Sequence, residues 1–291
     1  MGGIIGRNVA QAFRATAPPP FHVKSPVRSE ARLAVLWVGH ATVLLQLDDK
    51  LILTDPILSR TAGGLSKRLV APGLRAEEMP PLDAVVISHM HYDHLSNDSL
   101  RSLDARRKMA ALILPPDGLG YAARVRCPRV ELDRWNTWEH DGLRITAVPT
   151  DHVGWRYGYD RRRPLRSFTG YVLEYHGLRV YFAGDTAWNP RDFQAVRDRF
   201  GPIDLALLPI GPIEPRAMMQ RTHIDPRQAV DAFELLEASW MVPIHYDTFI
   251  NSMDAPGAVR AALLAELPRL GERASHVVLL GIGEQRVLLG R

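Results

Sequence analysis

A chain of 291 residues that is 46% hydrophobic and 23% charged has the composition of an ordinary soluble protein, which excludes general intrinsic disorder. Its one cysteine, Cys127, excludes an intramolecular disulfide and leaves nitrogen and oxygen atoms as the ligands of any metal site. The formal net charge of +4 is mildly basic and is compatible with an anionic substrate or an anionic surface.

The N-terminal region bears on where the protein acts. It has no signal-peptide h-region, and no apolar run approaches the roughly eighteen residues of a membrane span, so we expect a cytoplasmic protein. We interpret residues 1–25 as an extension before a single domain at residues 26–291. A helix predicted over residues 4–15 carries one apolar stripe, formed by Ile4, Ile5, Val9 and Phe13. This stripe suits contact with a membrane surface or a partner, and packing on its own domain is the alternative. Three prolines, residues 18–20, then form a stiff linker.

The first half of the chain is rich in predicted strands. Short apolar runs indicate them at residues 33–38, 42–47, 51–54 and 83–88. Glycine and proline pairs predict a long loop over residues 59–81, and loops of that length are usually functional or mobile. Asn97 or Asp98 is a candidate cap for a helix that reaches residue 108. A strand at residues 111–114 and a helix at residues 118–126 are expected next.

The second half alternates predicted strands and helices. A strand at residues 143–149 and a hairpin at residues 171–183 precede a helix at residues 190–200 and a strand at residues 205–209. Asp225 caps a helix that has Pro226 at its first position and reaches about residue 238. A strand at residues 240–244, a helix at residues 258–267 and two closing strands complete the chain. Grouped strands with helices between them predict an α/β protein whose sheets are covered by helices.

Four metal-binding side chains fall within six residues, directly after the apolar run at residues 83–88: His89, His91, Asp93 and His94. Residues two apart in an extended chain point the same way, so His89 and His91 are placed to share one ion. Asp93 and His94 follow once the chain has begun to turn, and they are placed to face a second ion. Imidazole and carboxylate together suit zinc, iron or manganese rather than calcium or magnesium.

Three further predicted strands also run into a candidate ligand, namely His152, Asp185 or His245. Taken singly, each has an ordinary explanation as a hydrogen-bonded histidine or a turn aspartate. Four strand ends that each deliver a metal-binding side chain are how an α/β scaffold builds a site at one edge of its sheets. Together they predict one metal centre.

The His-x-His-x-Asp-His motif, followed by His, Asp and His at these intervals, resembles the metallo-β-lactamase superfamily. More narrowly, several segments resemble the N-acyl-phosphatidylethanolamine-hydrolysing phospholipase D group: residues 37–45 (WVGHATVLL), 53–56 (LTDP), 181–186 (YFAGDT), 207–211 (LLPIG), 214–216 (EPR) and 223–226 (HIDP). The resemblance extends from about residue 33 to the end. It implies an αββα sandwich of two mixed β-sheets flanked by helices.

The resemblance also implies a ligand set for two divalent ions, with Zn²⁺ favoured over iron or manganese. One ion takes His89, His91 and His152, the other takes Asp93, His94 and His245, and Asp185 bridges them. Two side chains match positions directly behind the site, where they orient a ligating imidazole through its other nitrogen: His40 and Asp55. His223 matches a position that faces the substrate. Thr222 and Ala217 depart from the group's pattern, and these departures bear on substrate identity.

The implied activity is hydrolysis by a hydroxide that bridges the two ions. Asp93 orients that hydroxide and shuttles a proton, and His223 contacts a phosphate or protonates the leaving group. Arg156, four residues after His152, is a candidate to bind phosphate oxygens. The run at residues 161–163, three arginines, is a second candidate, with a solvated basic loop as its alternative.

Four hypotheses about function stay open. A phosphodiesterase of phospholipase D-like type is favoured, acting on a small-molecule or lipid-headgroup phosphodiester. Hydrolysis of a lactone, amide or carboxylic ester by the same site is the alternative. The basic charge invites a nuclease, but no recognisable nucleic-acid module supports one. A metal-stabilised binding protein without turnover ranks last, because every ligand position is filled.

Overall fold

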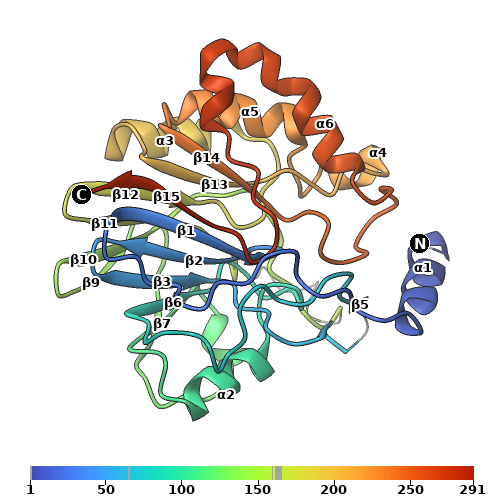
Figure 1. Ribbon diagram of the computed structural model, residues 1–291, viewed down its shortest axis with the longest axis horizontal. Coiled ribbons are helices and arrows are strands. Elements are labelled where there is room, and N and C mark those ends of the chain that lie inside the picture. The colour runs from blue at the N-terminus through green and yellow to red at the C-terminus, as the bar shows by residue number, and fades with distance from the viewer. Residues whose placement is uncertain (1, 65, 159, 161–165) are drawn as a thin grey trace.

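The computed structural model describes residues 2–64, 66–158, 160 and 166–291. Two large mixed β-sheets pack face to face, and helices cover the outer surface of each sheet (Figure 1). This is the αββα sandwich that the family resemblance implies.

The first sheet has seven strands in the order β15-β1-β2-β3-β6-β7-β8. Its first four strands pair antiparallel, and the pairs from β3 to β8 are parallel. The bounds of these strands are β1 Ala31–Gly39, β2 Thr42–Leu47, β3 Lys50–Thr54, β6 Ala84–Val86, β7 Leu112–Leu114, β8 Arg129–Glu131 and β15 Gln285–Gly290. A small separate hairpin, β4 Thr61–Ala62 and β5 Ser66–Lys67, lies within the predicted long loop.

The second sheet has six strands in the order β14-β13-β12-β11-β10-β9. Strands β9 to β12 form an antiparallel meander, whereas β12, β13 and β14 are parallel. Their bounds are β9 Thr137–His140, β10 Leu143–Val148, β11 Gly170–Tyr175, β12 Leu178–Phe182, β13 Leu205–Pro209 and β14 Trp240–Ile244.

Helices lie on both outer faces. In Figure 1, α2 lies below the first sheet, and α3, α5 and α6 lie above the second. The helices are α1 Gly2–Ala12, α2 Asn97–Ala105, α3 Pro190–Phe200, α4 Arg216–Met219, α5 Pro226–Leu235 and α6 Ala258–Glu266, with 3₁₀ segments Gly118–Gly120 and Leu267–His276. Among the described residues, no helix has both the length and the apolar character needed to cross a bilayer.

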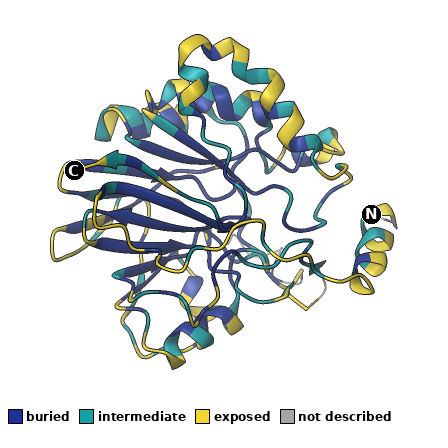
Figure 2. Ribbon diagram, viewed as in Figure 1, coloured by how far each residue is buried: buried dark blue, intermediate teal, exposed yellow. Residues whose placement is uncertain are grey.

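The two faces of the first sheet are both buried, as Figure 2 shows for its central strands. Along β1, Leu33 and Val35 point into the core between the two sheets. Leu36 and Val38 pack into the smaller core between the first sheet and α2. Strands buried on both faces read as continuous apolar runs rather than as alternating ones. Since such strands have no exposed face for polar side chains, the metal-binding residues are confined to the strand ends.

Most predicted elements agree with the structure to within a few residues, and the cap at Asp225 forms a full capping box with Gln228. Three predictions were wrong. Ser96, and not Asn97 or Asp98, caps α2, because its side chain accepts from the backbone N–H of Ser99. Residues 118–126 form only a short 3₁₀ turn. The side chains of Asn97 and Asp104 accept hydrogen bonds from the backbone N–H groups of Ala123 and Arg126, which a helix would need for its own backbone bonds. Only one strand closes the described chain, since the apolar run at residues 277–280 makes only an isolated bridge, between Val277 and Met241.

Candidate metal centre

The strand topology gathers the predicted ligands at one edge of the sandwich. Because β3 and β6 are parallel neighbours, Asp55 after β3 lies beside Ser88 after β6. In the second sheet, β12 and β14 run parallel and deliver Asp185 and His245 to the same edge. The segment after β10 carries His152 there as well. Ligands from both sheets therefore meet in one place.

The first group of ligands consists of His89, His91 and His152. His91 Nδ1 lies 2.9 Å from His89 Nε2 and 3.4 Å from His152 Nε2. All three rings thus direct one nitrogen at a common point. Imidazole nitrogens converge in this way when their lone pairs share a cation, so the grouping matches the first predicted ligand set.

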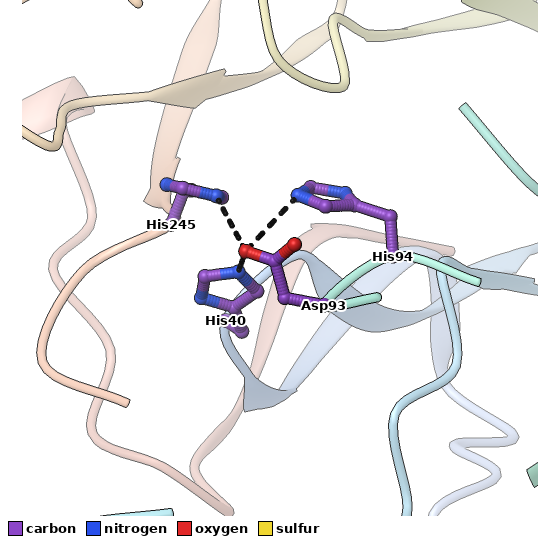
Figure 3. A group of neighbouring side chains, drawn as sticks. All are labelled: His40, Asp93, His94 and His245. Atoms are coloured by element: carbon purple, nitrogen blue, oxygen red, sulfur yellow. Dashed lines mark hydrogen bonds and ion pairs between the residues drawn. The ribbon is translucent and has the colours of Figure 1, made fainter. Parts of the chain in front are cut away.

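The second group consists of Asp93, His94 and His245, and it also includes His40. Figure 3 shows the Asp93 carboxylate pointing into the space between the three rings. Asp93 Oδ2 lies 3.0 Å from His40 Nε2, 3.7 Å from His245 Nε2 and 3.9 Å from His94 Nε2. His40 therefore contacts the carboxylate ligand directly, where the sequence predicted an orienting contact with an imidazole.

Asp185 lies between the two groups. Its Oδ2 atom is 3.3 Å from His94 Nε2 and 3.2 Å from His245 Nε2. The same atom is 3.8 Å from His89 Nε2 and 3.9 Å from His152 Nε2. A single carboxylate oxygen within 4 Å of imidazoles from both groups has the placement that a bridging ligand needs.

Hydrogen bonds behind the site fix which nitrogen each ring presents. His94 Nδ1 donates to Asp55 Oδ2 (2.7 Å), His152 Nδ1 to the carbonyl of Thr222 (2.9 Å) and His245 Nδ1 to the carbonyl of Gly211 (3.0 Å). Since these acceptors carry no proton, each Nδ1 must hold one, which leaves Nε2 as the ligand atom. Asp55 thus lies where a residue that orients a ligating imidazole is expected.

The histidines of the two groups differ in charge. Burial holds the pKa of His89 and of His152 well below the ordinary histidine value, so both rings are neutral at pH 7. Burial also opposes a charge on His245, but the carboxylate of Asp185 raises its pKa to about 9. The pKa of His94 is raised well above its ordinary value by Asp185 and Asp93, despite burial. In the second group, protons therefore occupy the nitrogens that a cation would take.

The residues present fit divalent metal ions. Among the described residues, the buried atoms of the centre without a hydrogen-bond partner include His94 Nε2 and His245 Nε2, which both face Asp93 and Asp185, and Asp185 Oδ1. Buried polar atoms almost always find a partner, so this concentration calls for one that protein atoms do not supply. The donors are imidazole nitrogens and carboxylate oxygens, the set that zinc, iron and manganese accept.

His223 completes the side chains around the centre. Its Nδ1 lies 3.6 Å from Asp185 Oδ2, and its ring stacks at 5.5 Å on that of His245. Burial lowers the pKa of His223 to about 4, although the charge of Asp185 opposes this shift. A neutral imidazole therefore stands next to both ligand groups at pH 7.

The guanidinium of Arg156 binds the protein backbone. Its Nη1 atom donates to the carbonyls of Met90 and Leu95, at 2.6 and 3.0 Å, and its guanidinium lies 4.1 Å from the centre of the Tyr92 ring. It thus contacts the loop that carries four of the ligands, and its contact with substrate stays a prediction. The three arginines at residues 161–163 lie outside the described residues.

Two cavities flank the centre. One, of about 310 Å³, reaches His245 and lies between α1 and residues 246–259. The other, of about 240 Å³, reaches Asp93 beside the β4–β5 hairpin. Phe249 and Ile250 line both, so this short segment separates two approaches to the ligands.

Sequence reasoning missed two contributors near the ligands. Ser88 Oγ donates to Asp55 Oδ2 at 2.5 Å and lies 2.9 Å from His89 Nδ1, so it links the loop after β3 to the ligand loop after β6. Gly184 has φ +61°, and a Cβ there would lie 2.4 Å from Ser88 Cβ. Each residue directly precedes a predicted ligand in the sequence, and this adjacency is the signal that could have identified it.

The fold and this centre define a class of αββα proteins with a histidine- and aspartate-rich edge. A family model described as the beta-lactamase superfamily domain matches residues 50–246. The chain belongs to this metallo-β-lactamase superfamily.

Three relatives illustrate the family. The chain is 32% identical over 238 residues to N-acyl-phosphatidylethanolamine-hydrolyzing phospholipase D 1 of Caenorhabditis elegans, a match that covers 76% of this chain and 65% of that protein. It is 31% identical over 216 residues to a UPF0173 metal-dependent hydrolase of Thermococcus onnurineus, which covers 74% of this chain and 85% of that protein. A possible metal-dependent hydrolase from Veillonella parvula has a similar structure, with a TM-score of 0.66, 17% identity and coverage of 88% and 99%. The predicted resemblance to the phospholipase D group is thereby confirmed, although the chain spans only about 65% of the nematode relative's length.

Proposed function

We propose that this chain is a hydrolase that works with two divalent metal ions and cleaves a phosphodiester. One observation carries the proposal, which is the position of Asp185 Oδ2 within 4 Å of imidazoles from both ligand groups. The nematode relative, named for hydrolysing an N-acyl-phosphatidylethanolamine, supports a phosphodiester as the substrate class.

His89, His91 and His152 would hold one ion, Asp93, His94 and His245 the other, and Asp185 both. When bound, two such ions supply a hydroxide nucleophile at neutral pH and polarise the bond under attack. The chain itself directs Nε2 of His94, His152 and His245 at the centre, through the acceptors that hold each Nδ1 proton in place. We favour Zn²⁺, because most of the donors are imidazole nitrogens, which suit zinc.

Asp93 and His223 are the proposed catalytic side chains. Burial opposes ionisation of Asp93, but His94 and the other neighbouring histidines hold its pKa well below the usual range. It is therefore an anion that accepts a hydrogen bond and orients the attacking water. His223 is neutral at pH 7 and carries one N–H, which suits a hydrogen bond to a phosphate oxygen or to the leaving group.

Hydrolysis of a lactone or another carboxylic ester is the second candidate. One observation favours it: Arg156, the cation expected to neutralise phosphate charge, directs Nη1 at two backbone carbonyls. A carboxylic ester develops a single oxyanion and needs less cationic support than a phosphodiester.

Elemental analysis of metal content, on the same sample assayed with bis-p-nitrophenyl phosphate and with a panel of lactones, tests the proposal. Two ions per chain with phosphodiester turnover is the expected result. Turnover of lactones alone would favour the second candidate. A chain that purifies without tightly bound metal, and stays inactive when metal is added, would refute both.

A further inference from the structure

The two cavities that flank the centre both reach the second ligand group. The larger, of about 310 Å³, extends to His245, and the smaller, of about 240 Å³, extends to Asp93. Both residues are proposed ligands of the same ion, and Asp93 Oδ2 lies 3.7 Å from His245 Nε2. A reacting group bound at that ion therefore adjoins both cavities.

A short segment after β14 forms the wall between the cavities. Phe249 lines both of them, and its ring contacts two buried side chains, His40 at 5.1 Å between ring centroids and the Arg68 guanidinium at 5.0 Å. The adjacent Thr248 accepts hydrogen bonds from two backbone N–H groups, that of His40 through its hydroxyl and that of Leu69 through its carbonyl. These contacts fix the wall and keep the cavities separate.

Helix α1 and the turn after it bring two arginines to the larger cavity. Arg7 and Arg14 line it together with His245. Because Arg14 is exposed and His245 is buried, the cavity runs from solvent to the ligand. Lys67 fixes the backbone of Arg14 by donating to its carbonyl at 2.6 Å. Among the described residues, no acceptor binds the Arg14 guanidinium, so it is available to an anionic ligand.

The acidic side chains of the larger cavity are already hydrogen-bonded to the backbone. Asp254 accepts through its two oxygens from the N–H groups of residues 213 and 214, at 2.9 and 3.1 Å. Asp247 accepts from the N–H of Gly257 at 3.0 Å. Arg7 donates to two backbone carbonyls, so within the described parts of the chain neither arginine of the cavity has a carboxylate partner. The cavity therefore favours an anionic group.

The smaller cavity has a different chemical character. Ala62, Tyr92 and Phe249 give it apolar walls, and Asp93, a proposed metal ligand, is the only charged side chain among the described residues that line it. The backbone of Gly63 lies directly on the Tyr92 ring, since a Cβ at Gly63 would be 2.6 Å from Tyr92 Cγ. Apolar and aromatic walls of this kind suit an alkyl or aromatic group.

We propose that the two cavities bind two different substituents of one ester substrate. An alkyl or aromatic substituent occupies the smaller cavity beside Tyr92. A small substituent that ends in an anionic group occupies the larger cavity, with its charge at Arg14. This inference rests on the proposed hydrolysis at the metal centre, because the bond to be cleaved then lies between the cavities. It holds for a phosphodiester and for a carboxylic ester alike.

Matched substrates test the assignment of the larger cavity. The metal-loaded full chain is assayed with p-nitrophenyl phosphodiesters whose second substituent is either propyl or 2-carboxyethyl. The parent protein should have a KM roughly fivefold lower for the carboxyethyl ester, as expected of an ion pair near solvent. Arg14→Ala should lose this preference, and Arg14→Lys should regain part of it. The matched control Arg124→Ala, which removes an exposed arginine elsewhere, should keep the preference of the parent.

A second variant tests the smaller cavity. Ser66 lines it, so Ser66→Trp should fill the space and raise the KM of both esters by roughly tenfold, without changing their ratio. Ser275→Trp, at an exposed position far along the chain, should leave both KM values unchanged. Metal content is measured for each variant to show that the ligand centre is intact.

The outcome can be separated from that of the proposed function. If the phosphodiesters are not hydrolysed, the proposed phosphodiesterase activity is wrong, and the p-nitrophenyl monoesters of butyric and succinic acid present the same two substituents on a carboxylic ester. If neither series is hydrolysed, Kd values from calorimetry replace KM. A parent protein without preference for the carboxylate in either series, or an Arg14→Ala variant that keeps the preference, would overturn the inference. Loss of the preference in Ser66→Trp would also overturn it, because the anionic group would then occupy the smaller cavity.

Discussion

At the scale of single residues, the centre depends on which ring nitrogen holds a proton. Asp55, Thr222 and Gly211 each accept from the Nδ1 of one imidazole and so direct its Nε2 at the centre. Such contacts raise the basicity of the ligand and fix the orientation of its ring. The metal affinity of each ligand therefore depends on the acceptor behind it as well as on the imidazole itself.

Replacing a ligand of the first group tests the assignment most directly. His89→Ala should abolish turnover and reduce bound metal, because it removes one of three converging nitrogens. His140→Ala, an exposed histidine on β9, is the matched control and should change neither. Elemental analysis and turnover are measured together, and full activity in His89→Ala would mean that the site is elsewhere.

The charge difference between the groups predicts proton release on metal binding. At pH 7 the raised pKa values of His94 and His245 leave both rings protonated without an ion, whereas His89 and His152 are neutral. A ligand must lose its proton to bind, so affinity at the second group should rise with pH up to about 9.

Titration calorimetry of metal-free protein with Zn²⁺, in buffers of different ionisation enthalpy, measures this release. We expect two binding phases, of which only one transfers protons to the buffer. Two phases with equal proton release would contradict the charge difference between the groups.

At the scale of elements, the ligand loop after β6 is held by a segment from the other sheet. Arg156 follows β10 and donates to the carbonyls of Met90 and Leu95, on either side of His91, Asp93 and His94. The backbone N–H groups of Arg156 and Tyr157 in turn donate to Asp160. The segment after β10 thus supports the loop as well as contributing His152.

Changing Arg156 distinguishes support of the loop from contact with substrate. Arg156→Ala should weaken metal binding by roughly 10–100-fold, as loss of a contact behind a ligand commonly does. Arg156→Lys should restore part of the affinity, and the exposed Arg124→Ala should have no effect. Metal affinity and KM are measured for each variant; a raised KM with unchanged metal affinity would favour contact with the substrate instead.

At the scale of the whole molecule, the centre joins the two sheets. The loop after β6 belongs to the first sheet, whereas His152, Asp185 and His245 follow strands of the second. Ions shared between them would therefore resist separation of the sandwich, in addition to the core between the sheets.

Removing metal should lower thermal stability. An ion that binds only the folded state stabilises it by about 4 kcal/mol when its free concentration is roughly a thousand times its Kd. For a protein of this size, chelation should lower Tm by roughly 10 °C. Calorimetry with and without EDTA measures this, and an unchanged Tm in a sample shown to have lost its metal would mean that the sheets do not depend on the ions.

Local sequence indicated the fold class and the candidate metal ligands. The motif at residues 89–94 is contiguous, and His152, Asp185 and His245 each follow a recognisable apolar strand. Strand ends of an α/β sandwich meet at one edge, so ligands at the ends of strands could be expected together before any contact was known.

Only the tertiary structure decided the contacts around those ligands. Arg156 is 66 positions from Met90, His40 is 53 from Asp93, and Asn8 is 242 from Ile250. Periodicity reports which side of an element is buried, but it does not report which distant segment that side meets. The hydrogen-bond partners of Arg156, His40 and α1 arise from the packing of segments far apart in the chain, and packing is a property of the folded molecule.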